Sequence, residues 1–232
     1  MSQALVPIEG SDRLWRITAG VFSSNCYALQ TSPGRCVLID PGLGGQEIRA
    51  GLQQLDLTPQ AVLCTHGHFD HGGSASVFQR EHGCPVYLHR DDVKTLRASN
   101  FLMMAFRIDA RVELPEVTQL GDEHHASDVV VDGCRFSFHT TPGHTPGSCV
   151  IQAGDLLFTG DTLYSRGIGL SKLPGERPDQ LRASIRSVFE SFGSHCRVFP
   201  GHGEAAELGW IRDHNLALLR FMEASGDMAQ ST

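Results

Sequence analysis

The amino-acid sequence predicts a mixed α/β (α+β) fold in which each half of the chain supplies strands and then helices. Short β-branched or apolar runs alternate with turn signals, and segments with helical spacing of apolar residues follow them. The chain has 232 residues, 41% of them hydrophobic and 19% charged, which suits one large domain with a sizeable core. Two sheets packed face to face with helices outside satisfy this order of elements, and so does an open α/β sheet.

The first half contains four short apolar runs that predict strands and two segments that predict helices. The second of these helices precedes Gly83, a residue type that suits the left-handed position after a helix end. The expected strands cover residues 25–29, 36–39, 61–64 and 85–88, and the expected helices cover 46–55 and 75–82.

The second half opens with a predicted run of antiparallel strands. An Asp132-Gly133 pair between residues 129–131 and 135–140 is a hairpin signal, and a further hairpin is expected around Gly154. We then expect a helix over 178–192, a strand over 197–199 and a closing helix over 207–224. Residues 1–225 are expected to form a single domain, and residues 226–232 a loose C-terminal tail.

Composition narrows the partners and the compartment that we expect. The formal net charge is -7 and basic residues form no run, so nucleic acid is not an expected partner. Neither an export signal nor a membrane-spanning run is found. Seven cysteines without a C-x-x-C pair favour a reducing compartment. We therefore expect a soluble cytoplasmic monomer or homodimer that acts on a small molecule and does not bind a membrane.

The densest group of chemically active side chains is the run THGHFDH at residues 65–71. It directly follows a predicted strand. In an extended segment residues two apart point the same way, so His66 and His68 can reach one metal ion together. If a helix begins near Asp70, the turn aims Asp70 and His71 at a second ion beside the first.

Three later segments supply the partners that such a half-site lacks. They are His144 in TTPGHTPGS, Asp161 in FTGDTLY and His202 in VFPGHGE, each after an apolar run and beside Gly or Pro. Loops at strand ends are common places for sites on a rigid scaffold. Hydroxyl groups that could hydrogen-bond the ligands are those of Thr65, Thr140 and Thr145.

The series THGHFDH, PGHTPGS, TGD and PGHG, in that order, resembles the metallo-β-lactamase superfamily, most closely its glyoxalase II-like (hydroxyacylglutathione hydrolase-like) members. The resemblance implies an αββα sandwich, with two mixed sheets flanked by helices. It also implies two divalent metal ions, usually zinc and sometimes iron or manganese. By this resemblance the first ion is held by His66, His68 and His144, the second by Asp70, His71 and His202, and both by Asp161.

The same resemblance implies hydrolysis of an acyl thioester such as S-D-lactoylglutathione. A hydroxide between the two metals would attack the carbonyl, and Asp70 would accept or relay the proton. In the loop after the bridging aspartate, where basic contacts to glutathione are expected, this chain has Leu170 where short glyoxalase-like and persulfide dioxygenase-like members tend to have arginine. Nearby basic residues that we expect to substitute for it are Arg166, Lys172 and Arg177.

An acyl-homoserine lactonase is the alternative hydrolase. Lactonases of this superfamily resemble the chain in having a tyrosine three residues after the bridging aspartate, here Tyr164, whose hydroxyl can donate to a substrate carbonyl. Residues 100–107, NFLMMAFR, would then suit an acyl chain, with Phe101 and Met104 as expected contacts. Packing in the core is the alternative role of this segment.

More distant alternatives are a persulfide dioxygenase with one iron and a non-catalytic scaffold of the same fold. Leu170 and the complete second ligand set argue against the dioxygenase, and scaffold relatives typically lose ligands. A true β-lactamase is disfavoured because zinc β-lactamases commonly have cysteine where this chain has Asp161. The short interval between His144 and Asp161 argues against the nuclease branch.

Overall fold

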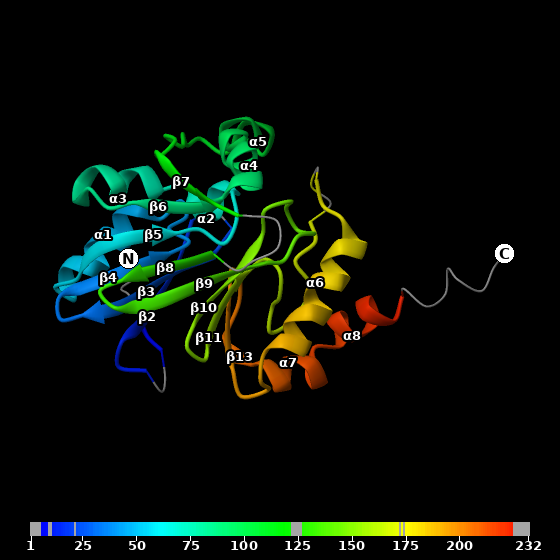
Figure 1. Ribbon diagram of the computed structural model, residues 1–232. Helices are drawn as coiled ribbons and strands as arrows, with labels where there is room; N and C mark the ends of the chain where they lie inside the picture. Colours follow the sequence, from blue (N-terminus) through cyan, green and yellow to red (C-terminus); the bar gives the residue numbers. More distant parts are fainter. Residues whose placement is uncertain are drawn as a thin grey trace.

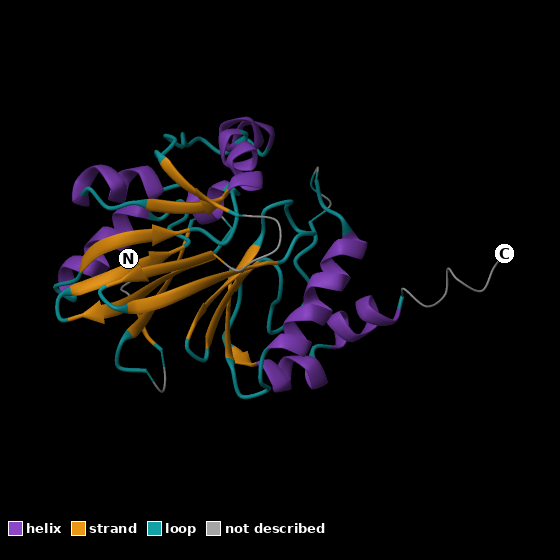
Figure 2. Cartoon of the chain, in the orientation of Figure 1, coloured by secondary structure: helices purple, strands orange, loops and turns teal. Residues whose placement is uncertain are grey.

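The computed structural model consists of two β-sheets packed face to face, with helices on both outer sides (Figure 1). It describes residues 6–8, 11–20, 22–121, 127–171, 173 and 175–224. Figure 2 shows the strands as two central layers and the helices as outer layers. The αββα sandwich that the resemblance implied is thus confirmed, and the open α/β sheet is not formed.

The first sheet has seven strands in the order β1-β2-β3-β4-β5-β6-β7. Strands β1 to β4 pair antiparallel and β4 to β7 pair parallel, so the sheet is mixed. The strands are β1 Val6–Pro7, β2 Leu14–Ala19, β3 Ser24–Ser32, β4 Arg35–Ile39, β5 Thr58–Leu63, β6 Val86–His89 and β7 Val117–Leu120. The helices among them are α1 Gly45–Gln54, α2 Phe69–Gly72, α3 Ala75–His82, the 3-10 turn η1 Arg90–Asp92, α4 Val93–Arg97 and α5 Ser99–Ala105.

The second sheet has six strands in the order β13-β12-β11-β10-β9-β8. It is antiparallel except that β11 and β12 run parallel. The strands are β8 Ser127–Val131, β9 Cys134–Thr140, β10 Cys149–Ala153, β11 Leu156–Gly160, β12 Arg197–Pro200 and β13 Ala206–Glu207. The helices are α6 Pro178–Ser191, α7 Leu208–His214 and α8 Leu216–Glu223.

Apolar side chains fill the spaces between these layers. Alternation along each strand sends one set of side chains inward, where Tyr27 of the first sheet meets Phe158 and Phe199 of the second. On the outer faces, helices bury residues such as Phe78 and Ile185 against the sheets. Close packing on both faces makes the sandwich a rigid support for the loops at its strand ends.

The predicted turns form as expected, but the predicted closing helix does not. Asp132 and Gly133 both have positive φ, 49° and 79°, as a two-residue hairpin of type I′ requires, and Gly83 ends α3 with φ 64°. The helix predicted over 207–224 is broken at Asn215. The Asn215 side chain accepts a bond from Leu218 N–H and starts α8 as a new helix, although the apolar spacing continues across the break.

The predicted tail, residues 226–232, lies outside the described residues. Among the helices that are described, none is long and apolar enough to cross a membrane.

Candidate metal centre

The predicted ligands lie on loops that follow strands. The first group follows β5, and His68 is the N-terminal cap of α2, with φ -70° and ψ 150°. Because α2 begins at Phe69, Asp70 and His71 occupy its first turn, as the sequence predicted. His144 lies in the loop between β9 and β10, Asp161 directly after β11 and His202 directly after β12.

Pairing between strands brings these loops together. Strands β11 and β12 are parallel neighbours, so the carboxyl ends that carry Asp161 and His202 lie side by side. The N–H of Cys149 donates to the carbonyl of Thr65 at 2.8 Å, which joins the two loops that carry His66 and His144 across the sandwich. The site is therefore assembled from both sheets.

Three imidazoles form the first cluster. His66, His68 and His144 are buried, and their ligand atoms all lie within 4.8 Å of one another. His144 Nε2 lies 3.0 Å from His68 Nδ1, with the two rings nearly perpendicular. Three converging imidazoles at this spacing form a group able to hold one ion and leave a further position open.

The second cluster contains Asp70, His71 and His202. Asp70 Oδ2 lies 3.7 Å from His71 Nε2 and 3.4 Å from His202 Nε2. Asp161 lies between the two clusters. Its carboxylate oxygens are 3.3 Å from His71 Nε2, 3.5 Å from His144 Nε2 and 3.6 Å from His202 Nε2. The structure thus brings all seven predicted ligands together.

Unsatisfied buried atoms test whether these residues fit metal ions. His66 Nε2, His71 Nε2 and Asp161 Oδ1 are buried without a hydrogen-bond partner in the part of the chain that is described. Such atoms are costly unless something binds them. A divalent cation satisfies imidazole nitrogens and a carboxylate oxygen together, and zinc, iron and manganese all accept this donor set. The residues fit the ions that the resemblance implied.

The family model of the metallo-β-lactamase superfamily matches residues 19–222. The chain belongs to the metallo-β-lactamase superfamily. Its family and its histidine and aspartate centre make it a metal-dependent hydrolase.

Relatives in this superfamily match almost over their whole length. The probable metallo-hydrolase YqgX of Bacillus subtilis is 31% identical, covering 86% of this chain and 94% of YqgX. The hydroxyacylglutathione hydrolase GloC of Haemophilus influenzae is 28% identical, with coverage of 86% and 94%.

Solved structures are also similar to this chain over most of its length. The chain is similar to TTHA1623 in a di-iron-bound form, with a TM-score of 0.77, 32% identity and coverage of 87% and 98%. It is also similar to the B3 metallo-beta-lactamase BLEG-1, with a TM-score of 0.75, 29% identity and coverage of 88% and 99%.

In this metallo-β-lactamase-superfamily protein, hydrogen bonds from neighbouring residues orient the histidine ligands of the metal centre. Asp40 Oδ2 accepts from Thr65 Oγ1 at 2.6 Å and lies 3.0 Å from His71 Nδ1. Because the Thr65 hydroxyl donates to Asp40, its oxygen is left to accept from His66 Nδ1 at 3.1 Å. His144 Nδ1 lies 2.8 Å from the Gly169 carbonyl. In each histidine, bonding at Nδ1 leaves Nε2 facing the centre.

Of the three threonines expected near the ligands, only Thr65 bonds a ligand histidine within the described hydrogen bonds. Thr145 donates instead to Asp92 at 2.7 Å. Thr140 is exposed on β9.

The pKa values of the ligand histidines are shifted in different directions in the two clusters. Burial, followed by the neighbouring histidines, lowers the pKa of His66, and burial with His144 lowers the pKa of His68 to about 4. These rings are neutral donors. Burial opposes the charge on His202, yet its bonds to Asp161 and Asp70 raise its pKa to about 9. A cation arriving at the second cluster therefore displaces a proton.

A cavity of about 560 Å³ opens onto the centre. Residues of both metal clusters line it, and aromatic rings form a wall: Phe22 packs on Phe69 and Phe106 with ring centroids 5.7 and 5.8 Å apart. Its lining consists of Phe22, His68, Phe69, Asp70, Phe106, His144, Asp161, Tyr164, Ser171, Leu173 and His202.

Among the predicted substrate contacts that the structure describes, only Tyr164 lines this cavity. Arg166 lies over the ring of Trp210, 5.7 Å from its centroid, and Arg177 is exposed where α6 begins. Lys172 lies outside the described residues. Neither Arg166 nor Arg177 lines this cavity, and their role as substrate contacts stays a prediction.

The expected contacts Phe101 and Met104 do not line this cavity either. Both are 67% exposed on α5. Helix α5 ends at Ala105, and Arg107 has φ 56°, so the chain turns there and Phe106 reaches the cavity instead. Phe22 and Leu173 were not predicted. Phe22 comes from a hairpin far from every motif, so no local pattern indicates it.

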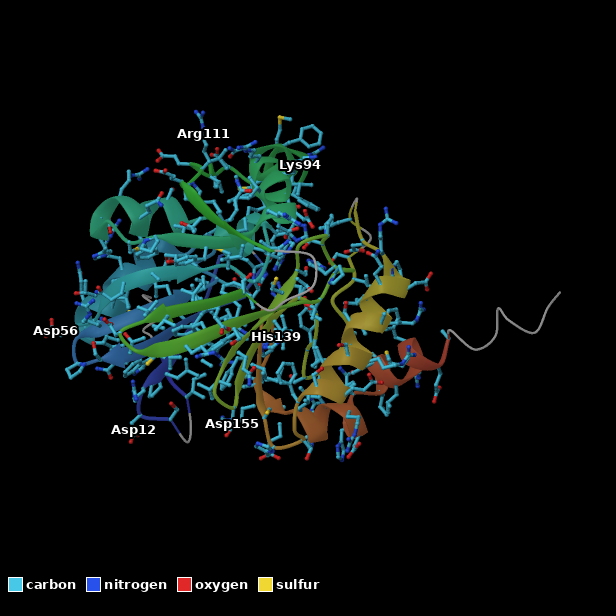
Figure 3. All side chains as sticks on the ribbon, viewed as in Figure 1. Asp12, Asp56, Lys94, Arg111, His139 and Asp155 are labelled. Atoms are coloured by element: carbon cyan, nitrogen blue, oxygen red, sulfur yellow. The ribbon has the colours of Figure 1, made fainter. Side chains whose placement is uncertain are left out.

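Another group of potential metal ligands lies away from this centre. Asp155, His195 and Cys196 have ligand atoms within 4.8 Å of one another, but Asp155 and His195 are exposed. Asp155 precedes β11, whereas Asp161 follows it, so the two groups lie at opposite ends of that strand. Figure 3 shows Asp155 far from the region of α4 that carries Lys94.

Proposed function

We propose that the protein is a binuclear thioesterase that cleaves an acyl thioester of the S-D-lactoylglutathione type. One observation carries this proposal: His66 Nε2 in the first cluster, His71 Nε2 in the second and Asp161 Oδ1 between them are buried without a hydrogen-bond partner among the described residues, beside a cavity of about 560 Å³. The similarity to GloC, named as a hydroxyacylglutathione hydrolase, supports the thioester. Zinc is the metal we propose, and the di-iron form of TTHA1623 supports iron as the alternative.

His66, His68 and His144 would hold one ion and Asp70, His71 and His202 the other, with Asp161 shared. When bound, the ions lower the pKa of a water molecule and polarise the substrate carbonyl. The chain's own residues transfer the proton and limit access of solvent. Asp70 Oδ2, which borders the cavity, is placed to accept and pass on the proton of the attacking water. The wall of Phe22, Phe69 and Phe106 limits access of bulk solvent.

Tyr164 is the proposed hydrogen-bond donor to the substrate oxygen. Its ring packs edge-on against His202, with centroids 5.9 Å apart. Burial, with the nearby Asp161 carboxylate, raises the pKa of Tyr164 well above its ordinary value. The hydroxyl therefore keeps its proton, and it can stabilise negative charge that develops on a substrate carbonyl.

The same tyrosine supports a second candidate, a lactonase that acts on acyl-homoserine lactones. The aromatic wall offers an apolar surface to an acyl chain. No arginine or lysine lines the cavity among the residues that the structure describes.

The test measures bound metal and hydrolysis together on purified protein. S-D-lactoylglutathione and an acyl-homoserine lactone are assayed side by side on wild type, on Asp70→Asn and on Asp155→Asn as control, since Asp155 lies in the exposed metal-ligand group. About two ions per chain, with thioester turnover lost only in Asp70→Asn, supports the proposal. Lactone turnover alone selects the second candidate. A single iron with no hydrolysis of either contradicts both.

A further inference from the structure

Asp92 is a buried carboxylate that has no part in the metal clusters. It ends the η1 turn after β6 and is 0% exposed. It is not among the residues that line the cavity, and no described metal-ligand group includes it. Burying a carboxylate is expensive unless hydrogen bonds satisfy it. The donors that satisfy Asp92 indicate what it does.

The three shortest of these bonds come from the two loops that carry the first cluster, and Thr95 Oγ1 of α4 adds a longer one at 3.4 Å. Asp92 Oδ2 accepts from the backbone N–H of Gly67 and from Thr145 Oγ1, each at 2.7 Å. Asp92 Oδ1 accepts from the backbone N–H of Gly147, also at 2.7 Å. Gly67 stands between His66 and His68, and Thr145 follows His144. One carboxylate thus bonds the loop after β5 to the loop between β9 and β10.

Two glycines make this close approach possible. A Cβ at Gly67 would lie 2.4 Å from the Asp92 carbonyl oxygen, and a Cβ at Gly147 would lie 2.8 Å from Asp92 N and 2.9 Å from Oδ1. Any other residue at either position would push its loop away from Asp92. The contact of Gly67 with Asp92 explains why that position lacks a side chain.

We infer that Asp92 is a positioning residue that sets the spacing of His66 and His68 relative to His144 before a metal ion binds. The two loops belong to different sheets, and besides the bond from Cys149 N–H to the Thr65 carbonyl, Asp92 links them at the residues next to the ligands. Because Asp92 holds both at fixed distances, the three nitrogens converge at lower entropic cost when the ion arrives. Partners beyond the ligands typically contribute 10- to 100-fold to metal affinity or activity.

The inference rests on the proposal that these histidines hold an ion, and the experiment separates the two. Zinc affinity is measured by chelator competition, and thermal unfolding is followed with and without zinc, for wild type, Asp92→Ala and Asp92→Asn. Asp132→Asn is the matched control. Asp132 also links distant segments, accepting from Thr31 and Arg35, but lies in the β8–β9 hairpin.

We expect Asp92→Ala to bind zinc about 10-fold or more weakly, and Asp92→Asn to lose less because one amide oxygen still accepts from Gly67 and Thr145. Asp132→Asn should leave zinc affinity unchanged. If Asp92→Ala lowers the stability of the zinc-free and zinc-loaded forms equally while zinc affinity stays as in wild type, Asp92 serves the fold only and the inference is overturned. If wild type itself binds no zinc or iron, the metal centre fails instead.

Thr145→Val and Thr145→Ser keep the test decisive should Asp92→Ala not fold. Valine removes the hydroxyl that donates to Asp92, and serine restores it. We expect weaker zinc binding in Thr145→Val and near wild-type binding in Thr145→Ser. Equal affinity in both variants contradicts the role assigned to Asp92.

Discussion

Asp161 Oδ1 lies 3.3 Å from His71 Nε2, yet both atoms are buried and neither has a well-oriented hydrogen bond. A cation bound among these two atoms and the neighbouring His144 and His202 would satisfy both of them. Among the described residues, Asp161 is the proposed carboxylate ligand with ion-pair distances to histidines of both clusters. Its removal should therefore affect both metal positions.

Asp161→Asn is expected to lower bound metal from about two ions per chain to one or fewer, and to reduce hydrolysis about 100-fold or more. Asparagine keeps the size of the side chain but removes the charge that two cations share. Metal content by elemental analysis and kcat/KM of the same preparation give the answer. Asp155→Asn is the control, and equal metal loss in both variants would contradict the role of Asp161.

Asp40 is expected to control the orientation of His71. It sits at φ 52° directly after β4 and accepts from both Thr65 N–H and Thr65 Oγ1. Asp40→Asn tolerates this backbone conformation but loses one acceptor, so zinc affinity should fall about 10-fold or more. Asp56→Asn, at an exposed turn with the same φ, tests whether any such substitution has this effect (Figure 3). Unchanged affinity in Asp40→Asn would remove the basis for this prediction.

Tyr164→Phe is expected to leave metal content unchanged and to lower kcat by about 10- to 100-fold. Phenylalanine keeps the ring packing on His202 and removes only the hydroxyl. Steady-state kinetics on the better of the two substrates measures the effect. A change in KM alone would show that Tyr164 contributes to binding without stabilising the transition state.

Asn215 holds the loop that carries Tyr164. Its buried amide donates to the carbonyls of Tyr164 and Gly167 and accepts from the N–H groups of Gly167 and Leu218. Asn215→Ala leaves these groups unpaired and should cost about 1–3 kcal/mol of unfolding free energy. Asn215→Asp keeps the acceptor but puts a carboxylate oxygen, which cannot donate, against the two carbonyls, so it should cost at least as much. Chemical denaturation of both variants gives the comparison, and wild-type stability in either would contradict this role of Asn215.

Asp132 should contribute stability only above the acid range. Its bonds from Arg35 and Thr31 lower the pKa of Asp132 below its ordinary value. A carboxylate with a lowered pKa in the folded state stabilises the fold above its unfolded pKa, about 3.9, and loses this effect as pH falls through the folded pKa. The stability difference between wild type and Asp132→Asn should therefore be full at pH 6 and shrink below about pH 4. A difference independent of pH would contradict this.

The ligands could be predicted from the sequence because each lies in a short motif after a strand. His66 to His71 are neighbours in the chain, and His144, Asp161 and His202 sit in Gly- or Pro-rich loops. The residues that support them could not be predicted in this way. Asp40, Asp92 and Phe22 reach the site from segments without a motif, and only tertiary packing brings them there.

The same reason explains where structure and prediction differ. Helical spacing is continuous through Asn215, so the break depends on hydrogen bonds to a loop some fifty residues earlier. In residues 100–107 composition indicated an apolar surface near the site, but the turn at Arg107 decides which side chain faces it. Arg166 and Arg177 are near Asp161 in sequence, but Arg166 lies over Trp210 and Arg177 at the start of α6, and neither lines the cavity.

The most direct test of the metal centre is a crystal structure of the zinc- or iron-loaded protein, with anomalous diffraction recorded at the metal absorption edge. We expect two peaks roughly 3.5 to 4 Å apart on either side of Asp161, one bounded by His66, His68 and His144 and the other by Asp70, His71 and His202. No peak beside Asp161, or a single peak at the exposed group of Asp155, His195 and Cys196, would contradict a two-metal hydrolase.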